Sequence, residues 1–184
     1  MLHNLKSLNK ASTKIFKDLI SGLEPRNFDG TSQSHRRIGG EIGGGQTYMP
    51  VCVECINENT WGQVFSIAHY YKQNSDLMAD PDMEFLVEID GEGIRGVYPL
   101  TFYQASLGQR DVGAWFEVSN GEEISNGAHS GDLQLHSRYY KQLSLAKFAN
   151  QWMKNIKVQQ SDYFKGVSKR RAKAKREAKK LAEA

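Results

Sequence analysis

Cysteine is scarce in this sequence, with two residues among 184, which excludes a disulfide-bonded miniprotein. No apolar run approaches the roughly 18 residues that a membrane-spanning helix needs. Residues 1–13 lack the apolar core of a signal peptide, so nothing predicts secretion. With 39% hydrophobic and 24% charged residues, the remaining class is a soluble globular protein. The length suits one domain with appendages and a core that needs no disulfide or metal.

Charge is distributed unevenly along the chain. The formal net charge is +3, but residues 165–184 contain nine basic and two acidic side chains, a local charge of +7. Residues 1–164 contain 15 basic and 19 acidic side chains and carry −4. Such an asymmetry indicates a polyanion-binding arm on a body with a different task.

The N-terminal quarter predicts an amphipathic helix followed by a loop. The apolar side chains that share one helical face within residues 1–24 are Ile15, Phe16, Leu19, Ile20 and Leu23. Pro25 should end this helix, because the residue before a proline is pushed out of the helical region. Residues 25–47 are rich in glycine and polar side chains, so we expect a mobile loop.

Two features of this loop could have a function. Residues 39–45 contain five glycines but no Gly-Lys-Ser/Thr, so a flexible linker is favoured over a phosphate-binding loop. The neighbouring His35, Arg36 and Arg37 either add to a polyanion contact or belong to a solvated loop.

From Tyr48 onward the pattern changes to strands. The segments with alternating or β-branched and aromatic side chains are 49–54, 63–71, 84–89, 97–103 and 114–118. Pairs such as Asp90-Gly91 and Asn120-Gly121 between or after these segments favour hairpins. We therefore expect a mostly antiparallel sheet over residues 48–119.

The last quarter returns to helix. One apolar face over residues 138–159, made of Leu145, Phe148, Ala149, Trp152 and Ile156, should pack on the sheet. Gly166 is expected to break the helix. Residues 168–184 are good helix formers with almost no apolar stripe, which predicts an exposed or fraying helix.

The expected fold class is α+β, an antiparallel sheet packed by an N-terminal and a C-terminal helix. The expected parts are an N-terminal helix (1–24), a Gly-rich mobile loop (25–47), an α+β domain (48–164) and a basic helical tail (165–184).

Cys52 and Cys55 form a C-x-x-C motif. Structural zinc needs four ligands, and no second such pair accompanies this one, although His69, His129 and His136 are available. Residues three apart on a strand point to opposite faces. A redox dithiol usually opens a helix, and no helical pattern follows. Two small, half-buried strand residues are the favoured interpretation, with zinc and redox chemistry as weaker alternatives.

An acidic cluster between two expected strands consists of Asp76, Asp80, Asp82 and Glu84, with His69 upstream. Clustered carboxylates can hold a hard divalent cation. Asp80-Pro81-Asp82 is also a typical turn sequence, whose carboxylates accept local backbone N–H groups, and this interpretation is favoured. The sequence has no G-x-S-x-G, so it does not support a hydrolase.

Aromatic side chains accompany the expected strands and could stack on bases. They are Trp61, Tyr70, Tyr71, Tyr98, Phe102, Tyr103, Trp115, Phe116, Tyr139 and Tyr140. At strand spacing such residues more often build a core, so base stacking is the weaker alternative.

The basic tail is the most specific feature. Its candidate nucleic-acid-binding residues are Lys169, Arg170, Arg171, Lys173, Lys175, Arg176, Lys179 and Lys180. Such a density of cations suits a phosphate backbone, and a helix that only promotes solubility is the alternative. A membrane-surface helix would need apolar bulk on its other face, where only Leu181 is present, so nucleic acid is preferred to lipid. In a eukaryotic protein the run could instead be a nuclear signal.

Two stretches resemble an uncharacterised bacterial family found on plasmids, conjugative elements and phages. Residues 69–85, HYYKQNSDLMADPDMEF, resemble the family stretch H-Y-Y-x-Q-N-G-D-L-M-x-D-P-E-M-x-F, and residues 148–159 resemble a second stretch. The residues singled out in these two stretches are His69, Tyr70, Asp76, Asp80, Pro81, Asp82, Phe148, Trp152 and Asn155. The likeness covers about residues 48–160.

The match departs from the family pattern at Ser75, where a glycine is usual, and Asp82 replaces a glutamate. The first departure leaves open a different backbone conformation in this loop. The resemblance implies a small α+β domain and a mobile-element setting in a bacterial cytoplasm. It transfers no activity and no catalytic residue.

Three hypotheses follow. The first is a non-enzymatic accessory protein of a mobile genetic element, which contacts nucleic acid or a nucleoprotein complex through the tail while the acidic body faces a protein partner. The second is an inhibitor of a host defence nuclease, of anti-CRISPR or anti-restriction type, that acts by protein binding. The third is a metal-dependent enzyme built on His69, Asp76, Asp80 and Asp82. We expect no cofactor and no membrane contact.

Overall fold

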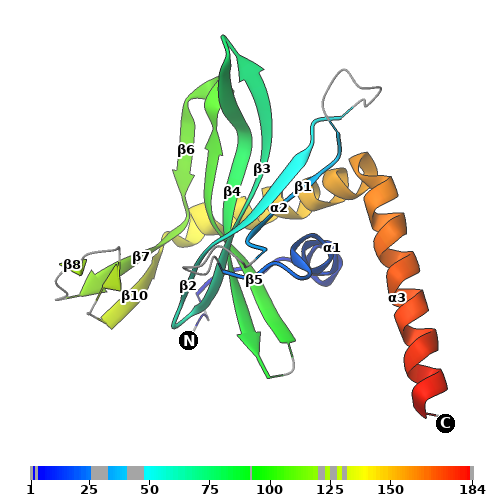
Figure 1. Cartoon of the computed structure of the whole chain (residues 1–184). Coiled ribbons are helices and arrows are strands. Elements are labelled where there is room, and N and C mark those ends of the chain that lie inside the picture. Colours follow the sequence, from blue (N-terminus) through cyan, green and yellow to red (C-terminus); the bar gives the residue numbers. More distant parts are fainter. Residues whose placement is uncertain are drawn as a thin grey trace.

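The computed structural model describes residues 2, 4–25, 33–40, 48–91, 93–119, 123–124, 128–129 and 132–182 (Figure 1). The elements of the first half are α1 (Lys10–Ile20), β1 (His35–Ile38), β2 (Val51–Asn59), β3 (Gly62–Gln73), β4 (Asp76–Asp90) and β5 (Gly93–Gln104). Those of the second half are the 3-10 turn η1 (Ala105–Leu107), β6 (Gln109–Val112), β7 (Ala114–Ser119), β8 (Glu123–Ile124), β9 (Ala128–His129), β10 (Asp132–Ser137), α2 (Tyr139–Gln159) and α3 (Ser161–Ala182).

The centre of the fold is a six-stranded sheet in the order β1-β2-β3-β4-β5-β6. Every neighbouring pair in it is antiparallel. Two further pairs, β7 with β10 and β8 with β9, form separate two-stranded ribbons. The expected α+β class and the antiparallel sheet are thus confirmed, because alternating side chains and hairpin turns favour local antiparallel pairing.

The two faces of the sheet bury different clusters. On the inner face, Phe16 of α1 contacts Phe65 and Phe85 edge-on, with ring centroids 6.2 Å and 5.0 Å away. The fully buried Met153 and Ile156 of α2 join the same core. On the outer face, Leu86 and its buried neighbours are covered by side chains such as those of Trp61 and Phe116. The expected packing of both helices against one face of the sheet is therefore confirmed.

The N-terminal region differs from the expectation in two ways. The helix begins only at Lys10, where the Asn9 side chain caps it by accepting a hydrogen bond from the Ser12 N–H, and residues 4–9 are not helical. Residues 35–38, expected in a mobile loop, form β1 and pair with β2. The side chain of Ile38 is buried, which gives this strand an apolar anchor. Residues 26–32 and 41–47 of the expected loop lie outside the described part.

The expected turn at Asp80-Pro81-Asp82 is wrong, because these residues lie inside β4. The pairing with β3 shifts register between Ala68 and Tyr70, and a proline, which lacks an N–H, is accommodated at such an irregularity. The turn itself lies at Asn74 and Ser75, both with positive φ (52° and 72°). Ser75 therefore adopts the left-handed conformation that a glycine would adopt there.

The break between the two C-terminal helices also lies at a different residue from the one expected. Gly166 lies within α3, and α2 ends before Gln160, whose buried side chain donates from Nε2 to the Met49 carbonyl. Phe148, expected on the packed face of α2, lies at the rim of that face, where it is 42% exposed and contacts Phe102 edge-on. None of the described helices is long and apolar enough to cross a membrane.

Candidate nucleic-acid interface

Helix α3 leaves the body as an arm (Figure 1). Its first turns are attached, because Phe164 and Val167 are buried against the core. From Ser168 to Leu181 every residue is exposed. The structure thus presents the candidate residues of the tail on a helix that contacts the body at one end only.

Five of the nine cations of α3 lie on one side of the helix. Lys165, Lys169, Lys173, Arg176 and Lys180 follow the spacing i, i+4, i+8, i+11 and i+15. At 100° per residue this spacing places all five within an arc of about 80°, which we call the outer stripe. Phe164 and Val167 lie on the opposite side of the helix, so the outer stripe faces away from the body. The other candidate residues, Arg170, Arg171, Lys175 and Lys179, flank it or lie behind it.

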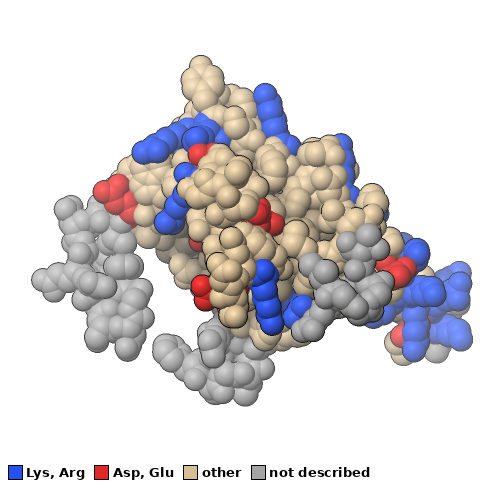
Figure 2. All heavy atoms as spheres, turned by 90° about the horizontal axis from the view of Figure 1, so that it is seen from above, with Lys and Arg blue, Asp and Glu red and all other residues tan. Residues whose placement is uncertain are grey.

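Few of these charges are neutralised by the protein. Lys165 pairs with Asp162 at 2.8 Å, and Lys173 with Glu177 at 3.8 Å. The Lys165 ammonium holds the pKa of the Asp162 carboxyl below its ordinary value. Among the described residues, Lys169, Arg176 and Lys180 have no carboxylate within ion-pair distance. Figure 2 shows the densest group of Lys and Arg side chains at the end of the molecule where α3 lies.

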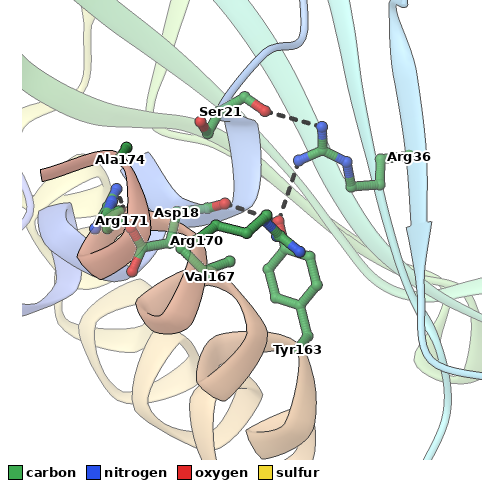
Figure 3. A pocket seen from close by; sticks show the side chains of 8 residues that line it. All are labelled: Asp18, Ser21, Arg36, Tyr163, Val167, Arg170, Arg171 and Ala174. Carbon is green, nitrogen blue, oxygen red and sulfur yellow. Dashed lines mark hydrogen bonds and ion pairs between the residues drawn. The ribbon is translucent and has the colours of Figure 1, made fainter. Parts of the chain in front are cut away.

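The junction between α3, α1 and β1 fixes the direction of the arm (Figure 3). The Arg36 guanidinium donates to the carbonyls of Leu19 and Ser21 at the end of α1, and to the Tyr163 hydroxyl. The Tyr163 hydroxyl in turn donates to the Asp18 carbonyl at 2.8 Å. Arg36 therefore caps the C-terminus of α1 and connects it to α3.

One ion pair continues this junction along α3. Arg171 Nη2 lies 2.5 Å from Asp18 Oδ1, whose side chain is only 13% exposed. These residues, with Arg36 and Arg170, line a cleft of about 450 Å³. The sequence pattern could not find this role of Arg36, because the triplet at 35–37 lay in an expected loop. His35 and Arg37 are exposed on β1.

The two cysteines do not form a site. Cys55 faces the core and is buried, whereas Cys52 is half-buried on the other face of β2. Burial raises the pKa of both thiols, that of Cys55 to about 11, so neither is a ready thiolate. The described residues contain no group of three or more His, Cys, Asp or Glu side chains that could hold a metal ion.

The residues of the expected acidic cluster do not converge on one site, although Asp82 and Glu84 share the outer face of β4, where Glu84 accepts a hydrogen bond from the Thr101 hydroxyl. His69 is buried on the inner face, where Nδ1 lies 3.0 Å from the Pro50 carbonyl oxygen. Asp82 alternates to the outer face and accepts a hydrogen bond from the Ser66 hydroxyl at 2.8 Å. Burial is the main cause that raises the pKa of the Asp82 carboxyl. Asp76 is exposed beside the hairpin turn, and Asp80 lines a different, open cleft with Met49 and Tyr71.

The two stretches of the resemblance meet in the core. His69 of the first stretch contacts Trp152 of the second edge-on, with ring centroids 5.7 Å apart. Tyr70 and Pro81 are half-buried along β3 and β4. Asn155 is exposed on α2 and accepts a hydrogen bond from Gln151. The contacts of His69 and Trp152 are those of a packed core.

The aromatic residues divide into core and surface. Trp61 and Tyr98 pack in the outer-face cluster, and Trp61 Nε1 donates to the Leu133 carbonyl. Tyr139 and Tyr140, at the start of α2, are 55% and 82% exposed. Trp115 stacks on His136 with Arg138 over its ring. Tyr103, which is 40% exposed, joins Tyr139 and Tyr140 among the aromatic side chains at the surface.

Residues 27–161 match the family described as Domain of unknown function (DUF6908). This match covers well over half of the chain, so the protein belongs to that family. No curated protein and no solved structure matches the chain. The matched region ends at the first residue of α3 and begins after α1. Helix α1 and all of α3 after Ser161, including the outer stripe, therefore lie outside the matched region, whereas Arg36 of β1 lies inside it.

Proposed function

We propose that the protein binds nucleic acid, alone or within a nucleoprotein complex, through the outer stripe of α3. The observation that carries this proposal is the row of five cations on the side of α3 that faces away from the body. On the resemblance of residues 69–85, we further propose that it acts by binding, without catalysis, as an accessory protein of a mobile genetic element in a bacterial cytoplasm.

A phosphate backbone is surrounded by condensed cations, and a protein that neutralises its phosphates releases them to solution. A row of lysines and arginines on one side of a helix offers several such contacts at once. Because Lys169, Arg176 and Lys180 have no ion-pair partner among the described residues, no protein carboxylate has to be displaced from them.

The small apolar area of α3 favours nucleic acid over a lipid surface. A membrane-surface helix needs a broad apolar face opposite its cations. The face of α3 opposite the outer stripe buries Val167 in the body and continues with Ala174 and Ala178. It therefore offers little apolar area to a bilayer.

The test is a quadruple variant of the outer stripe, in which Lys169, Lys173, Arg176 and Lys180 are all replaced by glutamine. Glutamine retains helix propensity, so the arm should persist while four charges are lost. Binding to labelled single- and double-stranded DNA and RNA is measured by fluorescence anisotropy between about 50 and 200 mM salt. We expect the slope of log affinity against log salt to fall by about 2.8–3.6, which is 0.7–0.9 per lost phosphate contact.

The matched control removes four exposed cations elsewhere, by replacing Lys72, Arg110, Lys147 and Lys154 with glutamine. It has the same net charge as the stripe variant but leaves α3 intact. An equal loss of binding in both variants would show that the net charge of the protein, and not the outer stripe, determines the affinity, and would contradict the proposal. Absence of binding by the wild-type chain to all four ligands would contradict it outright.

A further inference from the structure

A second group of cations lies on the other side of α3. The groove between α1, the start of β5 and α3 has a volume of about 420 Å³. Its cationic lining residues are Lys10, Lys14, Lys17, Arg95 and Arg171. No described residue that lines it is a carboxylate. We call this feature the α1–α3 groove.

Three elements far apart in the sequence bring these charges together. Lys10, Lys14 and Lys17 recur at i, i+4 and i+7 on α1, opposite the buried face that contains Phe16 and Leu19. Lys17 Nζ donates to the Ile94 carbonyl at 3.2 Å, which ties α1 to the start of β5. Arg95 follows on β5, and Arg171 enters from α3.

The charges of the groove are only partly neutralised. Arg95 lies 3.4 Å from Asp90, and Arg171 is paired with Asp18. Lys10 and Lys14 have no carboxylate within ion-pair distance among the described residues. Like charges one helical turn apart destabilise a helix by a few tenths of a kcal/mol. An anion in the groove would remove this repulsion.

The α1–α3 groove and the outer stripe are separate surfaces. Arg171 and Val167 lie on the side of α3 that faces α1, whereas Lys169, Lys173 and Arg176 lie on the opposite side. A ligand that contacts only the outer stripe does not reach Lys10 or Lys14. Loss of the two sites can therefore be measured independently.

We propose that the α1–α3 groove is a second phosphate-binding site, which holds backbone phosphates of the nucleic acid that α3 binds. This inference rests on the proposed function of α3 and adds the body of the protein to the interface. Phosphate is the anion that suits the groove, because it offers several oxygen acceptors to cations that converge from different elements. The nucleic acid would thus contact α3 on two sides and be held at the point where the arm joins the body.

The experiment compares the double variant Lys10→Gln, Lys14→Gln with the double variant Lys72→Gln, Arg110→Gln in the full-length chain. Both lose two exposed cations. We expect the groove variant to lower the salt slope by about 1.4–1.8 and the affinity at 100 mM salt about 25–60-fold, and the control to change neither appreciably. Thermal unfolding checks the fold, and Lys14→Arg, which keeps the charge, should retain wild-type binding.

Inorganic pyrophosphate tests whether the groove binds the backbone phosphates of a nucleic acid or a small phosphate compound. In a titration of the full-length chain followed by NMR, we expect weak, salt-sensitive shifts of the Lys10 and Lys14 amides. Two results together would assign the groove to a small phosphate compound and overturn the inference. The wild-type groove would be saturated by pyrophosphate, and the groove variant would keep the wild-type slope of log nucleic-acid affinity against log salt. Wild-type binding by the groove variant, with loss only in the outer-stripe variant, would overturn it while leaving the proposed function intact. If the wild-type chain binds no nucleic acid, both fail.

Discussion

Arg171 on α3 and Asp18 on α1 form an ion pair with 2.5 Å between Nη2 and Oδ1. This ion pair joins the middle of α3 to α1. Arg171 also lines both the cleft beside Arg36 and the α1–α3 groove. One side chain therefore holds the arm in place and borders two hollows rich in cations.

Loss of this ion pair should loosen the arm. For Asp18→Asn we expect the free energy of unfolding to fall by about 1 kcal/mol, because the half-exposed Arg171 loses the carboxylate that neutralises it. Urea denaturation measures this change, and a double-mutant cycle with Arg171→Gln isolates the pair. The control, Asp162→Asn, removes the exposed pair with Lys165 and should lower the free energy of unfolding less than Asp18→Asn does. Equal effects of the two variants would mean that the Arg171 pair has no structural role.

Ser75→Gly should stabilise the protein. Ser75 has a φ of 72° in the β3–β4 turn, a conformation that costs a residue with a side chain about 1 kcal/mol relative to glycine. We expect a gain of about 0.5–1 kcal/mol in the free energy of unfolding. Ser144→Gly, on the exposed side of α2, is the opposite control and should destabilise by a similar amount. A loss of stability in Ser75→Gly would show that the turn has another backbone conformation.

Gly166→Ala should also stabilise, since Gly166 lies within α3 and a Cβ there would meet only Arg170 Nη1, at 3.6 Å. Replacing a glycine inside a helix by alanine gains about 0.8–1 kcal/mol. Thermal unfolding measures the gain, and circular dichroism should show unchanged or higher helix content. Gly62→Ala is the contrasting variant, because φ is +137° and the new Cβ would lie too close to the Val87 carbonyl oxygen. It should destabilise by more than about 1 kcal/mol.

Stability should fall as the pH drops below about 6.5, the ordinary pKa of histidine. Burial against Trp152 lowers the pKa of His69 in the folded protein, so the unfolded chain binds the proton more tightly. The stabilisation is complete above the unfolded pKa and is lost as the pH falls through the folded one. Urea denaturation between pH 5 and 8 should show this slope in the wild type. His69→Asn, which keeps a donor for the Pro50 carbonyl, should reduce it; an unchanged slope would assign the pH dependence to other groups.

Local patterns were enough to predict much of this molecule. Alternating side chains predicted four of the strands of the main sheet, because one face of each must be buried. The spacing of Leu145, Ala149 and Ile156 predicted the packed face of α2. The composition of residues 168–182 predicted an exposed helix, since alanine, lysine and arginine favour helix but bury little apolar surface. Of the outer stripe, Lys169, Lys173, Arg176 and Lys180 were named as candidates from the sequence, whereas Lys165 was not.

Contacts between distant residues decided the rest. Asp80, Pro81 and Asp82 carry the composition of a turn, yet pairing of β4 with β3 on both sides of a register shift holds them in a strand. The chain breaks between α2 and α3 at Gln160, a residue type that does not itself break helices. There the Gln160 side chain donates a hydrogen bond to the Met49 carbonyl. The triplet at 35–37 becomes a strand only because β2 supplies a partner edge.

In the candidate interface, too, some properties follow from the sequence and others only from the fold. Its charge is a property of the sequence, because nine cations within a short helix-forming segment need no tertiary information to be recognised. Its geometry is a property of the fold. Lys14, Arg95 and Arg171 are separated by dozens of residues and meet in one groove only because the Tyr163 and Arg171 side chains join the first half of α3 to Asp18 of α1. Sequence spacing determines which charges share one helix face, whereas packing of the apolar faces determines which helices face each other.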